Sequence, residues 1–467
     1  MRTRSASAAL LLATTACAAL RGGPPLALPP LGDGAEVHVF LQKLPQEVER
    51  LSFVVESVSL RRADGTEVPL ALESREIDGS DPSQRRLAGG RVAPGEYAGL
   101  SVTISSAALG RGADQARLLT DPEPVREDLH LHLAPGRSAV VWLELGRSPV
   151  QPSFSFAPSF TALLASRTAP RAAIYCTGSA VASVTAADRA ARAVTDVLPV
   201  PGTPRGIAVD TLATRAYVAL HLEDKLEVLD LAAGVPVAEI RLQPGDGPGD
   251  LGMAADGTLV VVNVRSRTVA FVDPGSLSEL SRVSVGVDPS SLLVDRQGRR
   301  AYVTNRGSGT VSVIDLGNRA VIGTISTDPE PLRTALSWDG TLLYVVHRGS
   351  HYVASFSIPT LAPAARTFVG LGAVALKVDP RSGLIYLSRG EERRIAVLDP
   401  LSLQQVDAIE APGAVSIMTI DDAENTLLAL QPERRTILVV DLTSRRILAE
   451  VPVGAGAYAV AFYGERL

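Results

Sequence analysis

The second half of the chain carries one sequence unit that returns every 42 or 43 residues. One column of the unit closes an apolar run and is aspartate in six of seven copies: Asp188, Asp230, Asp273, Asp315, Ser357, Asp399 and Asp441. A second column, mostly tyrosine, keeps the same spacing: Tyr175, Tyr217, Val260, Tyr302, Tyr344, Tyr386 and Leu428. Two independent columns that share one period indicate a repeat array.

Each unit is typical of four short strands. The stretch 301–316, AYVTNRGSGTVSVIDL, holds two alternating apolar runs separated by a Gly/Ser turn, and further runs precede and follow it. The apolar period is two, which excludes a solenoid of helices. Four strands in about 42 residues predict one blade of a β-propeller.

The two ends of the repeat region complement each other. The first copy begins at its second strand, IYCTG, and the chain ends in a leading strand, YAVAFYGERL, with nothing after it. We expect these fragments to pair and to close a seven-bladed propeller over residues 170–467, since a closed ring protects the edges of its strands.

A different pattern precedes the repeats. Over residues 35–165 about seven short apolar or alternating runs are separated by turns such as ADGT and APG, which predicts a small β-sandwich. The expected fold class is therefore all-β: a seven-bladed β-propeller closed by N- and C-terminal strands and preceded by a small β-sandwich.

The N-terminus has the features of an export signal. Arg2 and Arg4 precede the apolar run AALLLATTA, and Cys17 follows in TTAC. This resembles the bacterial lipoprotein cleavage motif, in which the cysteine is lipidated, although Thr14 departs from it. We therefore expect a signal peptide over 1–17, a Pro/Gly-rich tether over 18–34 and lipidation of Cys17. The alternative is an ordinary secretory peptide cut near Ala19.

The expected location is the cell envelope. Ala18 differs from the aspartate of an inner-membrane retention signal, which favours an outer-membrane lipoprotein facing the periplasm or the cell surface; the alternative is a soluble periplasmic or secreted protein. No later segment holds about 20 uninterrupted apolar residues, so the lipid would be the only membrane attachment. The net charge of -5 gives no argument for nucleic-acid binding.

Two stretches carry family resemblances. AYVTN…VSVID at 42-residue spacing resembles the bacterial YVTN-type β-propeller repeat family, which overlaps the lactonase-like seven-bladed propellers. That resemblance implies the fold, and its relatives include envelope proteins of unknown role and sugar-lactone hydrolases. APGEYAGLSVTI (93–104) resembles a transthyretin-like sandwich domain of bacterial lipoproteins, which implies an accessory module without chemistry.

One face of the propeller is the place to look for a site. The hairpins between second and third strands gather around the channel with the loops that enter each first strand. Our candidate ligand-binding residues there are Arg205, Arg265, Asn305, Arg306, His347, Arg348 and Arg389. Arginine forks suit a carboxylate, a phosphate or an acidic glycan. The alternative is that the hairpin tips only need soluble residues.

Three of these candidates share one position of the repeat. Asn305, His347 and Arg389 occupy one position in successive repeats, and we expect them, with Asn263 and Gln431, to form a ring at the channel. The aspartate column that ends each third strand is expected to bond backbone N–H groups in a turn.

The function class that follows is a binding or scaffold module. We expect an anionic small molecule or glycan, or an envelope protein, as partner, a monomeric state, and no catalytic residue, metal or cofactor. The alternative is a lactonase-like hydrolase at the channel mouth. That enzyme would need clustered carboxylates or an acid/base set, for which His347 is the best candidate.

Overall fold

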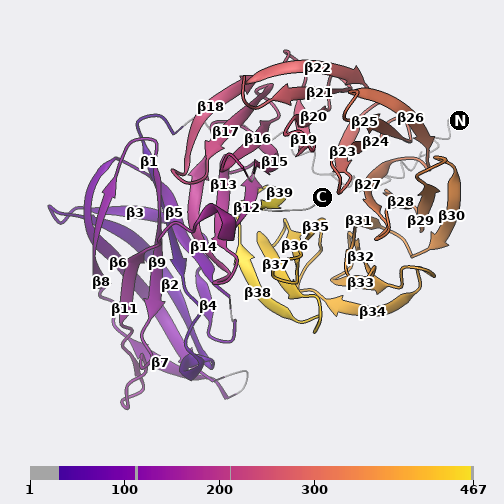
Figure 1. Cartoon of the computed structure of the whole chain (residues 1–467). Helices are drawn as coiled ribbons and strands as arrows, with labels where there is room; N and C mark the ends of the chain where they lie inside the picture. Colours follow the sequence, from indigo (N-terminus) through magenta and orange to yellow (C-terminus); the bar gives the residue numbers. More distant parts are fainter. Residues whose placement is uncertain (1–30, 82, 111–113, 211, 464–467) are drawn as a thin grey trace, which may run out of the picture.

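The computed structural model describes residues 31–81, 83–110, 114–210 and 212–463. The expected signal segment, Cys17 and most of the tether lie outside these residues. Two all-β regions lie side by side, an N-terminal one and a ring of small sheets (Figure 1). No helix in the described part of the chain is long and apolar enough to cross a membrane.

Seven four-stranded antiparallel sheets form the ring, which confirms the seven-bladed propeller. From the axis outward, blade 1 consists of β39 (Ala457–Phe462), β12 (Ala173–Gly178), β13 (Ser183–Asp188) and β14 (Ala193–Pro199). Blade 2 consists of β15 (Pro204–Asp210), β16 (Arg215–Leu220), β17 (Lys225–Asp230) and β18 (Val235–Arg241). Blade 3 consists of β19 (Pro248–Met253), β20 (Leu259–Asn263), β21 (Thr268–Asp273) and β22 (Ser278–Ser284).

The remaining four blades repeat this order. Blade 4 consists of β23 (Pro289–Val294), β24 (Arg300–Asn305), β25 (Thr310–Asp315) and β26 (Ala320–Ser326). Blade 5 consists of β27 (Pro331–Leu336), β28 (Leu342–His347), β29 (Tyr352–Ser357) and β30 (Pro363–Phe368). Blade 6 consists of β31 (Ala373–Val378), β32 (Ile385–Arg389), β33 (Arg394–Leu398) and β34 (Gln405–Glu410). Blade 7 consists of β35 (Ile417–Asp421), β36 (Thr426–Gln431), β37 (Thr436–Asp441) and β38 (Ile447–Pro452).

Blade 1 is assembled from both ends of the repeat region. The last strand, β39, pairs antiparallel with β12, and Val460 lies opposite Cys176. The ring is therefore closed by the complementary fragments, as the sequence predicted. Cys176 is buried, and burial strongly raises the pKa of its thiol, so it behaves as a small apolar side chain.

Adjacent blades bury their apolar side chains against each other. In β24 every residue from Ala301 to Asn305 is buried on both faces of the sheet. One cluster joins Tyr302 and Val313 of blade 4 to Leu343 and Val345 of blade 5. The tyrosine column of the repeat thus forms part of the packing between blades.

The aspartate column holds the turns between third and fourth strands. Asp315 Oδ1 accepts a 2.7 Å hydrogen bond from Asn318 N, and Asp230 Oδ1 accepts bonds of 2.9 and 2.8 Å from Ala232 N and Ala233 N. These bonds confirm the structural role expected for the column.

The N-terminal region is a separate all-β unit with one apolar core. Its strands follow one continuous hydrogen-bonded path, β10-β7-β6-β2-β3-β5-β1-β9-β11, with β4 on β2 and β8 on β6. Two sandwich-like sheets are thus joined through β3, with more strands than the seven expected. The elements are β1 (Ala35–Leu41), η1 (Gln46–Val48), β2 (Leu51–Arg62), β3 (Glu67–Leu72), β4 (Glu76–Asp78), β5 (Arg85–Val92), β6 (Gly95–Leu109), β7 (Ala116–Thr120), β8 (Val125–Leu133), β9 (Ser138–Leu145), β10 (Ser155–Phe156) and β11 (Phe160–Leu164); η3 (Pro170–Ala172) leads into blade 1.

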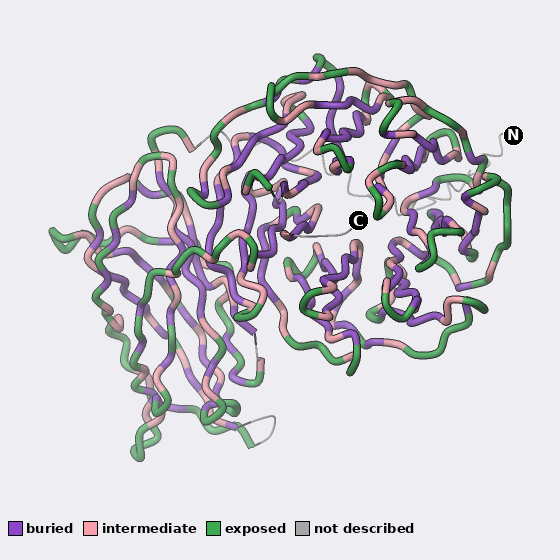
Figure 2. The backbone as a smooth tube through the Cα atoms, viewed as in Figure 1, coloured by how far each residue is buried: buried purple, intermediate pink, exposed green. Residues whose placement is uncertain are grey.

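The N-terminal unit covers the outer strand of blade 1. Phe40 and Val140 share an apolar cluster with Val194 and Val197 of β14. Trp142 Nε1 donates a 2.7 Å hydrogen bond to Val194 O. Every residue of β14 except Pro199 is buried, whereas the outer strands of blades 2 to 6 are largely exposed (Figure 2).

Candidate ligand-binding face

Hairpins and entry loops make up one face of the propeller, which we call the hairpin face. It contains the turns between second and third strands and the loops that lead from each fourth strand to the next blade. The seven candidate residues lie on this face or beneath it. The structure does not gather them into one site; it separates them into buried residues, arginines held by the framework, and two arginines without a carboxylate partner.

Asn305, one of the residues expected to ring the channel, is not available to a ligand at the surface. This side chain is fully buried at the end of β24, where its Nδ2 donates to Thr310 Oγ1 at 3.1 Å and Ser312 Oγ at 2.9 Å. Asn263 makes the equivalent 3.1 Å bond to Thr268 Oγ1. In blades 3 and 4 this position therefore ties the second strand to the third.

His347 occupies the same buried position in blade 5. The hydroxyls of Thr310 and Ser312 are replaced there by Tyr352 and Ala354, so neither ring nitrogen has a hydrogen-bond partner within the described residues. Burial lowers the pKa of His347 to about 4, which keeps the ring neutral at neutral pH. The best acid/base candidate from the sequence is therefore beneath the surface.

Two candidate arginines are held by the framework. Arg389 donates from Nη1 to Glu392 Oε2 at 2.7 Å and from Nη2 to the carbonyl of Val369. Arg265 Nη2 lies 3.1 Å from Asp224 Oδ1 and 2.6 Å from His221 O.

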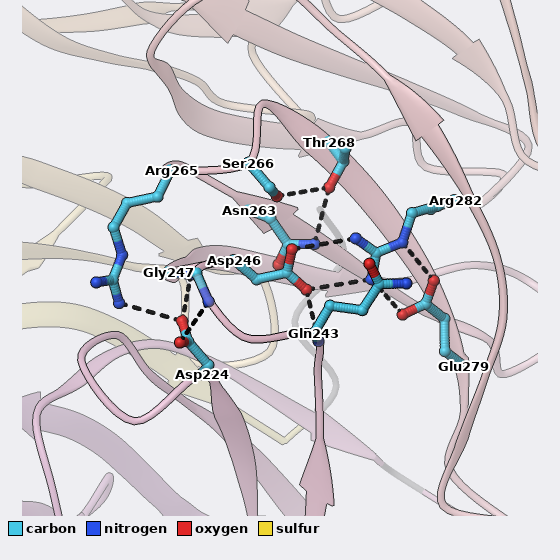
Figure 3. Close-up of polar contacts among 11 residues, drawn as sticks. Asp224, Gln243, Asp246, Gly247, Asn263, Arg265, Ser266, Thr268, Glu279 and Arg282 are labelled. Atoms are coloured by element: carbon cyan, nitrogen blue, oxygen red, sulfur yellow. Dashed lines mark hydrogen bonds and ion pairs between the residues drawn. The ribbon is translucent and has the colours of Figure 1, made fainter.

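Figure 3 shows the hydrogen bonds and ion pairs that engage the charged side chains around Arg265. Asp224 also accepts 2.7 Å bonds from the backbone N–H groups of Gly245 and Gly247. Asp246, which is 1% exposed, accepts two 3.1 Å bonds from Arg282, which makes further bonds to Glu279. These hydrogen bonds raise the pKa of the Arg282 guanidinium. The charges of this sector hold the loop 242–247 and neutralise one another.

Arg205 is different. It lies at the start of β15, one of the strands nearest the axis, and its Cζ is 5.5 Å from the centre of the Tyr458 ring on the neighbouring inner strand β39. Its side chain forms no ion pair within the described residues. Burial lowers its pKa, and the Arg265 charge acts in the same direction. Burial and Arg205 together lower the pKa of His221.

Arg306 and Arg348 line a cleft between blades 4 and 5. The blade 4–5 cleft has a volume of about 670 Å³ and is also lined by Asp288 and Glu330. Arg306 is paired with Asp288 at 2.7 Å. Arg348 is exposed, and no ion pair involves it in the part of the chain that the structure describes. The cleft thus contains one neutralised and one free guanidinium.

Sequence reasoning missed the acidic and aromatic neighbours of these arginines. Tyr458 lies in the C-terminal strand, which was read only as the closure of the ring. Asp288 and Glu330 occupy a loop position that is glycine in blades 3, 6 and 1, at Gly247, Gly372 and Gly456. Aligning the entry loops of the repeats would have shown that departure.

Among the described residues, no group of three or more His, Cys, Asp or Glu side chains is placed to bind one metal ion.

Comparison with known proteins identifies the fold as a β-propeller. No family model and no curated protein matches the chain. Among solved structures, hydrazine synthase of Kuenenia stuttgartiensis is 17% identical, with a TM-score of 0.54 over 60% of this chain and 95% of that chain. A functionally unknown protein of Desulfotomaculum acetoxidans is 11% identical, with a TM-score of 0.54 over 62% and 98%. The dihydro-heme d1 dehydrogenase NirN, in complex with DHE, is 15% identical, with a TM-score of 0.51 over 64% and 76%.

Proposed function

We propose that the protein is an exported, lipid-anchored envelope protein whose propeller binds an anionic ligand on the hairpin face without catalysis. The fold supports a binding or scaffold module, because propellers present many loops of independent sequence on one rigid face. The signal-like segment with Cys17 supports the envelope location.

Arg205 carries the proposal for the ligand. A partly buried guanidinium without a carboxylate partner loses hydration that the Tyr458 ring beside it replaces only in part. The nearby carboxylate of Asp224 is already engaged by Arg265 and by two backbone N–H groups, and the neutral ring of His221 adds no negative charge. A carboxylate or phosphate bound by Arg205 would supply that charge through bidentate hydrogen bonds.

Thermal shift with inorganic phosphate and with citrate tests this site. We expect either anion to raise the Tm of the native protein, and Arg205→Gln to remove that rise. Arg393→Gln is the matched control, because Arg393 is an exposed arginine of the hairpin of blade 6. A rise of equal size in Arg205→Gln and the native protein would contradict the assignment.

Lipidation has its own test. Labelling of the expressed protein with a radioactive fatty acid is expected, and Cys17→Ser is expected to abolish it and to release the protein from membranes. Label retained in Cys17→Ser would overturn the anchor.

The lactonase-like alternative finds less support. A hydrolase at the channel mouth needs an acid/base group within reach of a substrate, and His347 is 0% exposed. Turnover of a sugar lactone by the purified protein would nevertheless replace the binding proposal with the enzymatic one.

A further inference from the structure

The blade 4–5 cleft has two carboxylates at positions where the backbone favours glycine. Asp288 and Glu330 precede the first strands of blades 4 and 5 with φ values of 54° and 53°. At the equivalent position, Gly372 has a φ of 84°. A side chain in this left-handed region costs more than glycine does, and Glu is not among the residues that tolerate it well. Such backbone outliers point to functional positions.

The two carboxylates face the same cleft in different states. Each backbone carbonyl accepts a 2.9 Å hydrogen bond from the first residue of its blade's hairpin, Arg306 N on Asp288 O and Arg348 N on Glu330 O. In blade 4 the side chains of this couple form an ion pair. In blade 5 no ion pair within the described residues joins Glu330 to Arg348. Beside the Arg306–Asp288 ion pair, the cleft therefore contains a carboxylate, Glu330, and a guanidinium, Arg348, that form no ion pair with each other.

An aromatic platform lies on the same blade. The rings of His351 and Phe368 are stacked at 6.0 Å with an interplanar angle of 8°, and Tyr352 packs edge-on to Phe368 at 5.7 Å. Phe368 is 64% exposed and Tyr352 is 38% exposed. In a chain with only 4% Phe, Trp and Tyr, two such exposed rings in contact beside a histidine ring are a concentrated surface for stacking.

The platform lies close to the cleft along the chain. Arg348 and His351 begin and end one hairpin turn, so their Cα atoms are at most about 11 Å apart. Asp328, in the entry loop that lines the cleft, pairs with Arg366 at 2.6 Å. The Arg366 guanidinium in turn lies 5.0 Å from the centre of the Tyr352 ring.

We propose that the blade 4–5 cleft and this platform bind a glycan that contains uronic acid. A sugar ring stacks its C–H face on an aromatic ring, whose face is electron-rich. Its hydroxyl groups both donate and accept, as Glu330 and Arg348 require. A uronate carboxylate completes the match at Arg348. A simple anion fits less well, because two carboxylates line the same cleft. The inference concerns a different site from Arg205 and does not depend on an anion there.

Titration calorimetry with three uronic-acid hexasaccharides tests the proposal: alginate, oligogalacturonate and hyaluronan. We expect a Kd below 1 mM for at least one of them and at least tenfold weaker binding of neutral cellohexaose. Phe368→Ala and Arg348→Gln are each expected to weaken the uronate at least tenfold. Trp338→Ala and Arg296→Gln are matched controls, since both side chains are exposed on the opposite face, and they should leave Kd unchanged.

Glu330→Gly separates a binding role from a structural one. Glycine relieves the left-handed backbone, so the Tm should stay equal or rise, while uronate affinity should fall at least tenfold. Unchanged affinity in Glu330→Gly overturns the role of the carboxylate. Failure of all three uronates, or binding of inorganic phosphate with the same dependence on Arg348, overturns the glycan; neither result affects the test at Arg205.

Discussion

Blade 1 and the other blades share a sequence plan but differ at their outer strands. In blade 1 the position of Val197 is buried beneath the N-terminal unit. Its register mates on the outer strands of blades 2 to 7 are Glu239, Arg282, Thr324, Arg366, Ala408 and Glu450. Polar side chains predominate where the strand faces water, and valine stands where the N-terminal unit covers it.

The difference indicates that blade 1 is the blade that the N-terminal unit stabilises. Blade 1 alone is built from both ends of the repeat region. Its inner strand, β39, is therefore joined to the other strands of the blade only through hydrogen bonds and packing. The N-terminal unit adds apolar area and hydrogen bonds to that blade. It also makes polar contacts with the neighbouring blades 7 and 2, at Glu450 and at Ala233. Figure 1 shows the unit beside blade 1. We infer that the two units unfold together. Four changes at the outer strands and blade interiors test how blade 1 differs from the other blades.

Val197→Glu gives blade 1 the residue of blade 2. The new carboxylate would be buried without a partner, so we expect a loss of about 3–5 kcal/mol in the free energy of unfolding. Urea unfolding followed by circular dichroism measures it. A loss below about 1 kcal/mol would mean that the N-terminal unit does not seal this strand.

Acid should destabilise the protein through His347 of blade 5. The pKa of His347 is about 4 when folded and about 6.5 when unfolded. The unfolded state therefore binds more protons between these values, and stability falls as the pH drops from 6.5 to 4, by about 3 kcal/mol. His347→Asn, which copies blade 4, should remove this part of the pH dependence. Parallel stability curves for the two proteins from pH 7 to 4 would refute the assignment.

Gln84→Ala removes one polar contact from the interface. Gln84 Oε1 accepts a buried 2.7 Å hydrogen bond from Val194 N, and the orphaned N–H should cost about 1–3 kcal/mol. Faster hydrogen exchange of the Val194 amide is the local readout. Protection equal to that of the native protein would show that another acceptor replaces the amide.

Thr324→Glu makes the same change as the first prediction on an exposed outer strand. Thr324 is the register mate of Val197 in blade 4 and faces solvent, so stability should change by no more than about 0.5 kcal/mol. A loss as large as that of Val197→Glu would mean that burial by the N-terminal unit is not the cause of the difference.

The fold was predictable because its signals are local and repeated. A period of 42 residues, strand-length alternation and the Asp–turn pairing each depend on residues close in sequence. The complementary ends predicted the closure of the ring. The number of N-terminal strands was not predictable, because short edge strands such as β4 and β10 depend on neighbours distant in the chain.

The site was harder to predict because the sequence of a loop does not show which side chain each of its charged residues will pair with. Arg265, Arg306 and Arg389 looked alike in sequence to Arg205 and Arg348, yet each of the three pairs with a carboxylate. The partners of Arg265 and Arg306 lie on neighbouring loops, and that of Arg389 lies in its own hairpin. His347 and Asn305 were expected at the channel. The direction of a side chain at a strand end depends on the local twist of the blade, which the sequence does not show. The glycine column of the entry loops held a signal that only comparison between repeats reveals.

The pairing of β39 with β12 has a consequence for how the protein is made. Cys176 cannot meet Val460 until all the residues between them have been synthesised, so blade 1 is completed after the other six blades. Until then β12 presents a bare edge of unpaired backbone groups, which is prone to pair with other chains. A ribosome that stops early would thus release a product in which that edge stays exposed, and shielding of nascent chains by a chaperone should matter more for this protein than for one whose last strand lies at the periphery.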